Sequence, residues 1–278
     1  MQEKADSRKG RLKSYDERRK KVSQFNLTSD IFFGKTVEDI EACQEVVQIL
    51  TRKKLKIKSV KTQYSIRNVE NRSVVLDALA EDEEGRLINV EMHPQEDEDH
   101  VRRVRYHLSG IDMSYLEKGN DFEAIPEVYL IYITKKDFIG RNKGINEIIR
   151  IVDGTGTILD NGVHELYVNF EGAADTPKQR ELLDYMEHSA ADYETGTFPH
   201  LAARVRLLKE KKEGIDIMCD ILEKERAEGK AEGKAEGMAA GIAAFILDNL
   251  EEHKTEEQIL AKLVKRFSLS LSLIHISE

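Results

Sequence analysis

Two neighbouring segments of strand-like sequence each carry a single carboxylate inside an apolar run. The first, Ser73–Ala80, contains Asp77, and the second, Leu87–His93, contains Glu91. Between them, the sequence Glu83-Glu84-Gly85 fits a three-residue hairpin loop, whose last residue commonly adopts the left-handed conformation that glycine favours. We therefore expect an antiparallel hairpin here, and the length of its loop fixes the register of the two strands.

That register determines which side chains face each other. If Asp82 pairs with Arg86 across the loop, Asp77 lies directly opposite Glu91, with the two Cβ atoms about 5 Å apart. His93 lies on the same face, because side chains alternate along a strand. The hairpin is thus predicted to bring two acids and a histidine together.

Two carboxylates in direct opposition repel each other and destabilise a sheet. A hard divalent cation such as Mg²⁺ offsets this repulsion, because it binds carboxylate oxygens and keeps several waters. A metal-bound water is also acidified into a usable nucleophile. The spacing alone leaves two interpretations open. One is a metal-dependent hydrolase, and the other is an edge hairpin whose acids are solvated and neutralised by nearby Arg or Lys.

The segments around the hairpin predict helices and strands in alternation. Ser29 or Asp30 can cap a first helix, and a strand with charged edges follows within Thr51–Arg67. After the hairpin, the acids at 97–99 suit the positive N-terminal end of a helix. The next segment, Glu127–Thr134, is apolar enough for a strand buried on both faces. The order helix, three strands, helix, strand indicates an α/β fold.

The C-terminal half adds one more strand and then helices. Val163–Phe170 is strand-like, whereas Lys178–Ser189 and Leu201–Glu225 are helical in character. The tract at 227–238 repeats AEGK, in which Ala, Glu and Lys favour helix but each Gly costs up to about 1 kcal/mol. A marginal helical linker and a self-association face built on the small residues both fit this tract. Thr255-x-x-Gln258 is a capping-box pattern that predicts a short final helix.

Six stretches of sequence, taken in order, carry a family resemblance. They are Ser29–Lys35 (SDIFFGK), Lys61–Arg67 (KTQYSIR), Leu76–Asp82 (LDALAED), Asn89–His93 (NVEMH), Arg102–Tyr106 (RRVRY) and 162–169 (GVHELYVN). Together they resemble the recombination-promoting nuclease and transposase family (Rpn-like) of bacteria, within the PD-(D/E)XK nuclease superfamily. This resemblance implies an α/β PD-(D/E)XK-like core, made of helix, three strands, helix and strand, with a helical C-terminal extension.

The resemblance also implies an endonuclease that hydrolyses phosphodiester bonds of double-stranded DNA with Mg²⁺ or Mn²⁺. Asp77 and Glu91 match the two metal-binding carboxylates of the family. His93 stands where the superfamily has Lys and where this family usually has Gln. Superfamily members often add an acid from the first helix, and Glu45 is the candidate for this third metal ligand.

The histidine at position 93 leaves the activity open. Lys supplies positive charge near the attacking water, and Gln orients that water by hydrogen bonds. An imidazole can orient water and can accept a proton near neutral pH. The alternative is a catalytically degenerate member of the fold that binds nucleic acid or a partner protein without cutting.

Charge is unevenly distributed along the chain. With 43 Lys and Arg and 52 Asp and Glu, the net charge is −9, which argues against coating nucleic acid by bulk charge. Residues 1–26 instead hold nine basic and four acidic residues, and we expect them to be a disordered segment. Two local basic groups could contact phosphates without sequence choice. They are Lys53, Lys54 and Lys56 before the hairpin, and Arg102, Arg103 and Arg105 after it. For the arginines, ion pairs with the acids at 97–99 are the alternative.

Other features exclude several classes of protein. No run of about 18 apolar residues occurs, as a membrane span would need, and residues 1–26 lack the apolar stretch of a signal peptide. Cys43 and Cys219 lie far apart in the chain and fit no metal or disulfide spacing. A reduced, cytoplasmic protein is expected, and the C-terminal helices could make it a homo-oligomer.

The last eight residues, Leu271–Glu278, read LSLIHISE. They resemble the peptide encoded in frame by a transposon-end sequencing adapter, so we expect the natural chain to continue beyond about Ser270. The predicted organisation is then a basic segment at 1–26, a nuclease core at 27–170 and a helical addition at 171–226. A linker with a short helix follows at 227–270.

Overall fold

The computed structural model describes residues 15–68 and 72–267. The chain divides into two compact units, Met1–Met218 and Cys219–Glu278. The segment 271–278, with its expected artificial origin, and residues 1–14 of the basic segment lie outside the described residues.

The N-terminal segment differs from its expected disorder over residues 15–26. Residues 15–23 are helical, and the Val22 side chain is fully buried. The ring of Phe25 stacks on that of Phe32 with 6.4 Å between centroids. The prediction of a disordered segment is therefore wrong here, because apolar residues spaced among the basic ones anchor the segment to the core.

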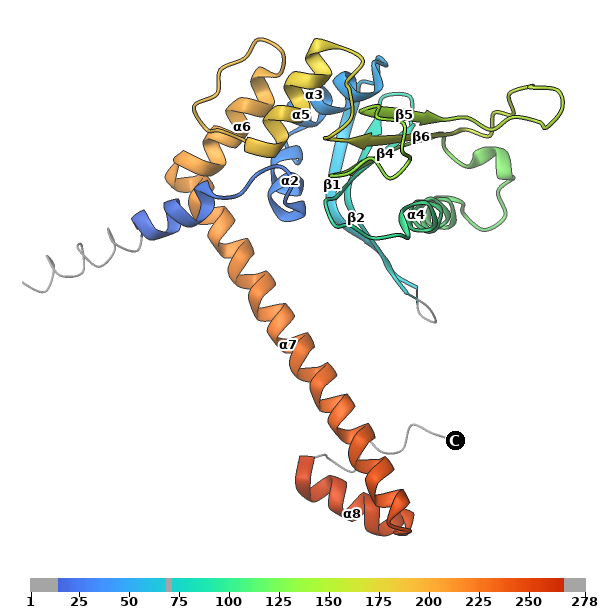
Figure 1. Ribbon diagram of the computed structural model, residues 1–278, viewed down its shortest axis with the longest axis vertical. Helices are drawn as coiled ribbons and strands as arrows, with labels where there is room; N and C mark the ends of the chain where they lie inside the picture. Colours follow the sequence, from blue (N-terminus) through green and yellow to red (C-terminus); the bar gives the residue numbers. More distant parts are fainter. Residues whose placement is uncertain (1–14, 69–71, 268–278) are drawn as a thin grey trace, which may run out of the picture. The chain divides into compact units, whose positions relative to one another are not determined.

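A six-stranded sheet forms the centre of the first unit (Figure 1). Its order is β1-β2-β3-β4-β6-β5, with parallel pairing of β3 to β4 and of β4 to β6 and antiparallel pairing elsewhere. The strands are β1 (Ile57–Ile66), β2 (Val74–Asp82), β3 (Leu87–His93), β4 (Val128–Thr134), β5 (Ile145–Ile148) and β6 (Val163–Asn169). The expected strands are all present. The short edge strand β5 was not predicted, since its four residues give no readable alternation.

The β2–β3 hairpin has the register predicted from its loop. The backbone N–H of Asp82 donates to the carbonyl of Arg86 at 3.1 Å, and Gly85 has a φ of 80°. The strands then pair rung by rung as far as Ala78 opposite Val90. The Asp82 carboxylate accepts hydrogen bonds from the backbone and side chain of Arg86, which pins the turn.

Helices cover both faces of the sheet (Figure 1). On one side, α2 (Asp30–Val37) and α3 (Ile40–Thr51) lie against β1, and α5 (Pro177–His188) and α6 (Pro199–Glu210) pack on α3. The single first helix expected from sequence is broken, because Asp39 caps α3 by accepting the Ala42 N–H at 3.0 Å. A one-turn 3-10 helix, η1 (Phe122–Ala124), precedes β4.

The opposite face is covered by α4 (His100–Tyr115). Its residues Val104, Leu108 and Ile111 enter a buried cluster with side chains of β2, β3, β4 and β6. Their spacing of four and three residues puts all three on one side of α4, which fixes which side of the helix faces the sheet and which side faces solvent.

Beyond the sheet the chain is helical. The segment Leu201–Glu225, expected as one helix, is two, because α6 ends at Glu210 and α7 (Lys212–Glu251) begins after Lys211. The AEGK tract lies within α7 and is helical. The last helix, α8 (Glu256–Phe267), has the predicted capping box, in which Thr255 and Gln258 exchange hydrogen bonds. No helix among the described residues is long and apolar enough to cross a membrane.

Candidate active site

A cleft of about 760 Å³ opens at the end of the hairpin that is far from its loop. Its walls come from β2, β3 and α4 and from the start of α2. Asp77, Glu91 and His93 all line it. The three residues that the sequence selected are therefore brought together, as the register predicted.

Asp77 lies one step beyond the last hydrogen-bonded rung of the hairpin. Its carboxylate accepts the backbone N–H of Met92 at 2.8 Å. This side-chain bond continues the attachment between β2 and β3 where the ladder has ended. The carboxylate is consequently held in place inside the cleft rather than left to rotate in solvent.

The electrostatics of this acid are unusual. Burial, and next the negative charge of Glu91, raise the pKa of Asp77 from 3.8 to about 8, against the opposing effect of the Met92 N–H. Asp30 adds a smaller effect in the same direction. A carboxyl group in this state retains its proton near neutral pH unless a cation takes the proton's place.

Glu91 completes the acidic pair. Its side chain is buried, and its Oε1 atom has no hydrogen-bond partner among the described residues. An orphaned buried oxygen beside a second, repelled carboxylate fits a divalent cation. As the side chains stand, no group of three or more His, Cys, Asp or Glu in the described parts of the chain is placed to hold a metal ion. Waters would complete the coordination shell, as they do for Mg²⁺.

His93 is oriented by contacts on two sides. Its Nε2 atom lies 2.9 Å from Oδ2 of Asp97. Its ring stacks against Tyr132 at 5.7 Å between centroids and meets the edge of His100 at 5.5 Å. The imidazole at position 93 is thus fixed within the cleft.

Glu45 lies away from this site. Its carboxylate accepts the backbone N–H groups of His200 at 3.1 Å and Leu201 at 2.8 Å, at the start of α6. The expected role as a metal ligand is wrong for this conformation, because the first helix is split and Glu45 belongs to the second part. It caps another helix instead.

The acid that the first helix contributes to the cleft is Asp30, which sequence reasoning considered only as a cap. Asp30 opens α2 and lines the cleft with Asp77 and Glu91. The helix α2 crosses β2 closely at Gly34, where a Cβ would lie 3.6 Å from the Asp77 carbonyl. The signal was the acid at the N-terminal end of the first helix, but its proximity to Asp77 depends on how α2 packs.

Arginines form the basic side of the cleft. Arg102, Arg103 and Arg105 from α4 line it, together with Arg72, which the sequence did not single out. Arg103 is 3.0 Å from Asp97 and 3.1 Å from Asp99, so the ion-pair alternative holds for this residue. Arg102 and Arg105 are exposed and have no carboxylate partner in the described portion of the chain.

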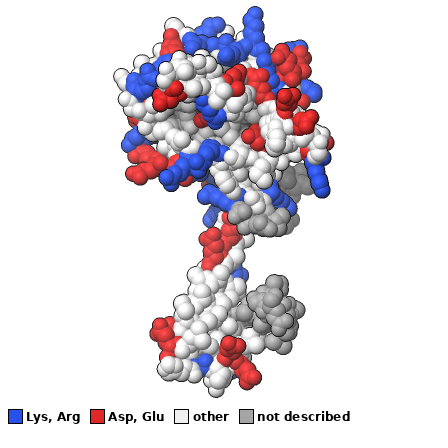
Figure 2. Space-filling model, turned by 90° about the vertical axis from the view of Figure 1, so that its right-hand side faces the viewer, with Lys and Arg blue, Asp and Glu red and all other residues white. Residues whose placement is uncertain are grey.

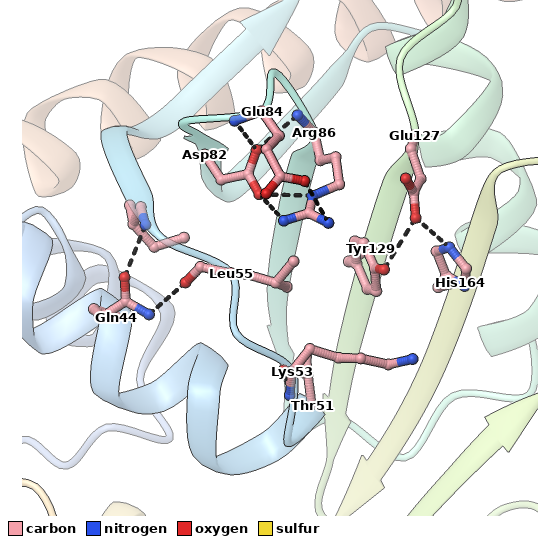
Figure 3. A network of polar contacts seen from close by, with 11 residues as sticks. Gln44, Thr51, Lys53, Leu55, Asp82, Glu84, Arg86, Glu127, Tyr129 and His164 are labelled. Atoms are coloured by element: carbon pink, nitrogen blue, oxygen red, sulfur yellow. Dashed lines mark hydrogen bonds and ion pairs between the residues drawn. The ribbon is translucent and has the colours of Figure 1, made fainter.

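The three lysines lie elsewhere. Lys53, Lys54 and Lys56 precede β1, and Lys56 pairs with Glu83 of the hairpin loop. Figure 3 shows Lys53 beside the polar network in which Glu127 contacts both Tyr129 and His164. Asp82 is five residue steps along β2 from Asp77, or about 17 Å. The lysines are therefore not brought to the cleft, because they precede Ile57, the first residue of β1, which pairs with Asp82 at the loop end of the hairpin.

Figure 2 shows basic and acidic side chains interspersed over the face of the first unit that it displays, so that this face has no uniform sign of charge.

Comparison with known proteins agrees with the fold. A family model described as PD-(D/E)XK nuclease family transposase matches residues 32–189. No curated protein and no solved structure matches the chain. The matched range contains the whole six-stranded sheet, α4 and the Asp77–Glu91 pair, with the element order expected of a PD-(D/E)XK nuclease core. The chain therefore belongs to the PD-(D/E)XK nuclease family transposases.

Proposed function

We propose that the protein is a divalent-metal-dependent endonuclease that hydrolyses phosphodiester bonds of double-stranded DNA. The observation that carries this proposal is the pairing of Asp77 and Glu91 at the base of an arginine-lined cleft. The raised pKa of Asp77 supports it, because a site built to bind a cation costs stability when the cation is absent.

Asp77 and Glu91 hold the cation, Mg²⁺ or Mn²⁺, and Asp30 is the third acid within the cleft. When bound, such a cation supplies an acidified water and neutralises charge on the phosphate. The chain's own contribution is to fix the carboxylates. The Met92 N–H holds Asp77, and the surrounding strands bury Glu91.

His93 orients the attacking water in place of the usual Gln. Asp97 holds the Nε2 side of the ring, so the imidazole presents a fixed face to the cleft. Arg72, Arg102 and Arg105 contact the DNA phosphates, which positions the backbone without reading its sequence.

The test is incubation of the full chain with supercoiled plasmid and Mg²⁺ or Mn²⁺, beside Asp77→Ala and His93→Gln. We expect the wild type to nick or linearise the plasmid, the addition of a chelator to stop it, and Asp77→Ala to be inactive. Equal cutting by wild type and Asp77→Ala would refute the assigned site.

One observation favours a second candidate, a degenerate nuclease fold that binds nucleic acid without cutting it. His93 replaces the residue that the family uses beside the acids, and its Nε2 is already engaged by Asp97. An inert wild type together with an active His93→Gln variant would identify this second function.

A further inference from the structure

A second histidine faces the acidic pair from the opposite wall of the cleft. His107 on α4 has its Nδ1 atom 3.5 Å from Oε1 of Glu91, and the two side chains are 13% and 6% exposed. Neither atom has a hydrogen-bond partner among the described residues. Two buried polar atoms thus face each other with their hydrogen-bonding capacity unused.

The separation of these atoms suits donors that share one ion. Two donors each about 2.1 Å from a cation lie about 3.0 Å apart at a right angle and about 3.4 Å apart at a tetrahedral angle. We propose that His107 is a ligand of the same cation that Asp77 and Glu91 hold, the three side chains closing around the ion as it binds, and that it makes the site prefer Mn²⁺ and Co²⁺ to Mg²⁺. This inference rests on the proposed function, since it assigns a ligand to that metal site.

The preference follows from the chemistry of the donor. Mg²⁺ takes oxygen ligands and retains its waters, so an imidazole adds little to its binding. First-row transition ions accept nitrogen donors, with affinity rising from Mn²⁺ to Co²⁺ at a given site. A carboxylate pair with one imidazole therefore shifts selectivity along that series.

The packing of α4 keeps His107 in this position. Its neighbour Leu108 and the residue Val104 are buried in the cluster beneath the helix, so α4 cannot rotate without exposing apolar surface. His93 is the other imidazole of the cleft, but its Nε2 lies against Asp97 and its ring stacks on Tyr132. His107 is accordingly the imidazole whose nitrogen points at the acidic pair.

The experiment is calorimetric titration of the chelator-treated full chain with Mg²⁺, Mn²⁺ and Co²⁺ at one fixed pH. The variants are His107→Gln, Asp77→Asn and, as a matched control, His188→Gln, an exposed histidine on α5. We expect His107→Gln to weaken Mn²⁺ and Co²⁺ binding about tenfold or more, with Mg²⁺ affinity nearly unchanged. His188→Gln should leave all three affinities unchanged.

The outcomes separate this inference from the proposed function. If Asp77→Asn abolishes binding but His107→Gln keeps the wild-type ratio of Co²⁺ to Mg²⁺ affinity, the metal site stands and the role of His107 is refuted. A simple His107–Glu91 ion pair gives that unchanged ratio together with a lower melting temperature of the metal-free variant. If the wild type binds none of the ions, or Asp77→Asn binds them as well as the wild type, the metal site itself falls and His107 with it.

Discussion

At the scale of single residues, Asp77 has the most distinctive environment in the cleft. It joins β2 to β3 through the Met92 N–H while lying against a second buried acid. This position allows the Asp77 carboxylate to bind a cation, but it also makes ionisation of the carboxyl group unfavourable when no cation is bound. Its protonation should therefore be visible in the stability of the metal-free protein.

The stability of the metal-free protein is expected to fall as the pH rises. Because the pKa of Asp77 is raised to about 8 in the fold from 3.8, folding favours the protonated form. The stability that the protonated Asp77 carboxyl contributes is fully present below about pH 4 and is lost as the pH rises to about 8. Urea unfolding with a chelator, at about pH 5, 6.5 and 8, should show the wild type losing stability relative to Asp77→Asn. A constant difference across this range would contradict the assignment.

Gln63 has a left-handed backbone inside β1, with a φ of 49°. This conformation costs an L residue about 1–2 kcal/mol, whereas Gly adopts it freely but loses more entropy on folding. Gln63→Gly removes this cost but also removes the hydrogen bond of the Gln63 side chain to the Asp77 carboxyl, so we expect the free energy of unfolding to change by less than about 1 kcal/mol. Chemical denaturation at pH 7 measures this, and a larger loss of stability would show that the Gln63 side chain contributes more than its backbone costs.

Individual site residues differ in how far sequence could locate them. Asp77, Glu91 and His93 were predictable because one short loop sets their register, and no distant part of the chain is involved. Asp30 and Arg72 were not, since their place in the cleft depends on the packing of α2 and on the approach to β2. Glu45 was misplaced for the same reason.

At the scale of elements, the hairpin and the strands follow local rules, and the helix boundaries do not. The break between α2 and α3 depends on the Asp39 cap. The break between α6 and α7 allows Gly214 to approach α6, where a Cβ would lie 2.2 Å from the Leu207 carbonyl. Periodicity of apolar residues continues through both breaks, so it cannot reveal them.

The cap that Glu45 provides for α6 can be measured. Glu45→Ala removes the acceptor of the His200 and Leu201 N–H groups and should cost about 1 kcal/mol of stability. Thermal or urea unfolding at neutral pH gives this value. Glu41→Ala, on the same helix but exposed, serves as the control and should change stability by less than about 0.5 kcal/mol. Equal losses of stability in the two variants would show that Glu45 does not cap α6.

At the scale of the whole molecule, the net charge of −9 conceals an uneven distribution of acidic and basic side chains over the surface. Acids gather at the base of the cleft and arginines on its α4 wall, while the lysines before β1 lie at the far end of the sheet. DNA affinity should therefore come from a few side chains rather than from overall charge.

The two basic groups give opposite predictions for DNA binding. Replacing both Arg102 and Arg105 by Ala should weaken binding of a DNA duplex and lower the slope of log affinity against log salt by about 2. Replacing both Lys53 and Lys54 by Ala should leave that slope nearly unchanged. Fluorescence anisotropy over a range of salt, with Ca²⁺ in place of Mg²⁺, makes the comparison. A larger effect of the lysine variant on the slope would contradict this prediction and would place the DNA-binding site at the loop end of the hairpin.

The assignment of the metal site to the cleft is tested by plasmid cleavage with Mn²⁺, in which two glutamates are compared. Glu91 lies in the cleft, and Glu45 caps α6 outside it. We expect metal-dependent cutting by the wild type and by Glu45→Gln, and none by Glu91→Gln. Cutting by Glu91→Gln at the wild-type rate would contradict this assignment, as would loss of cutting in a folded Glu45→Gln variant.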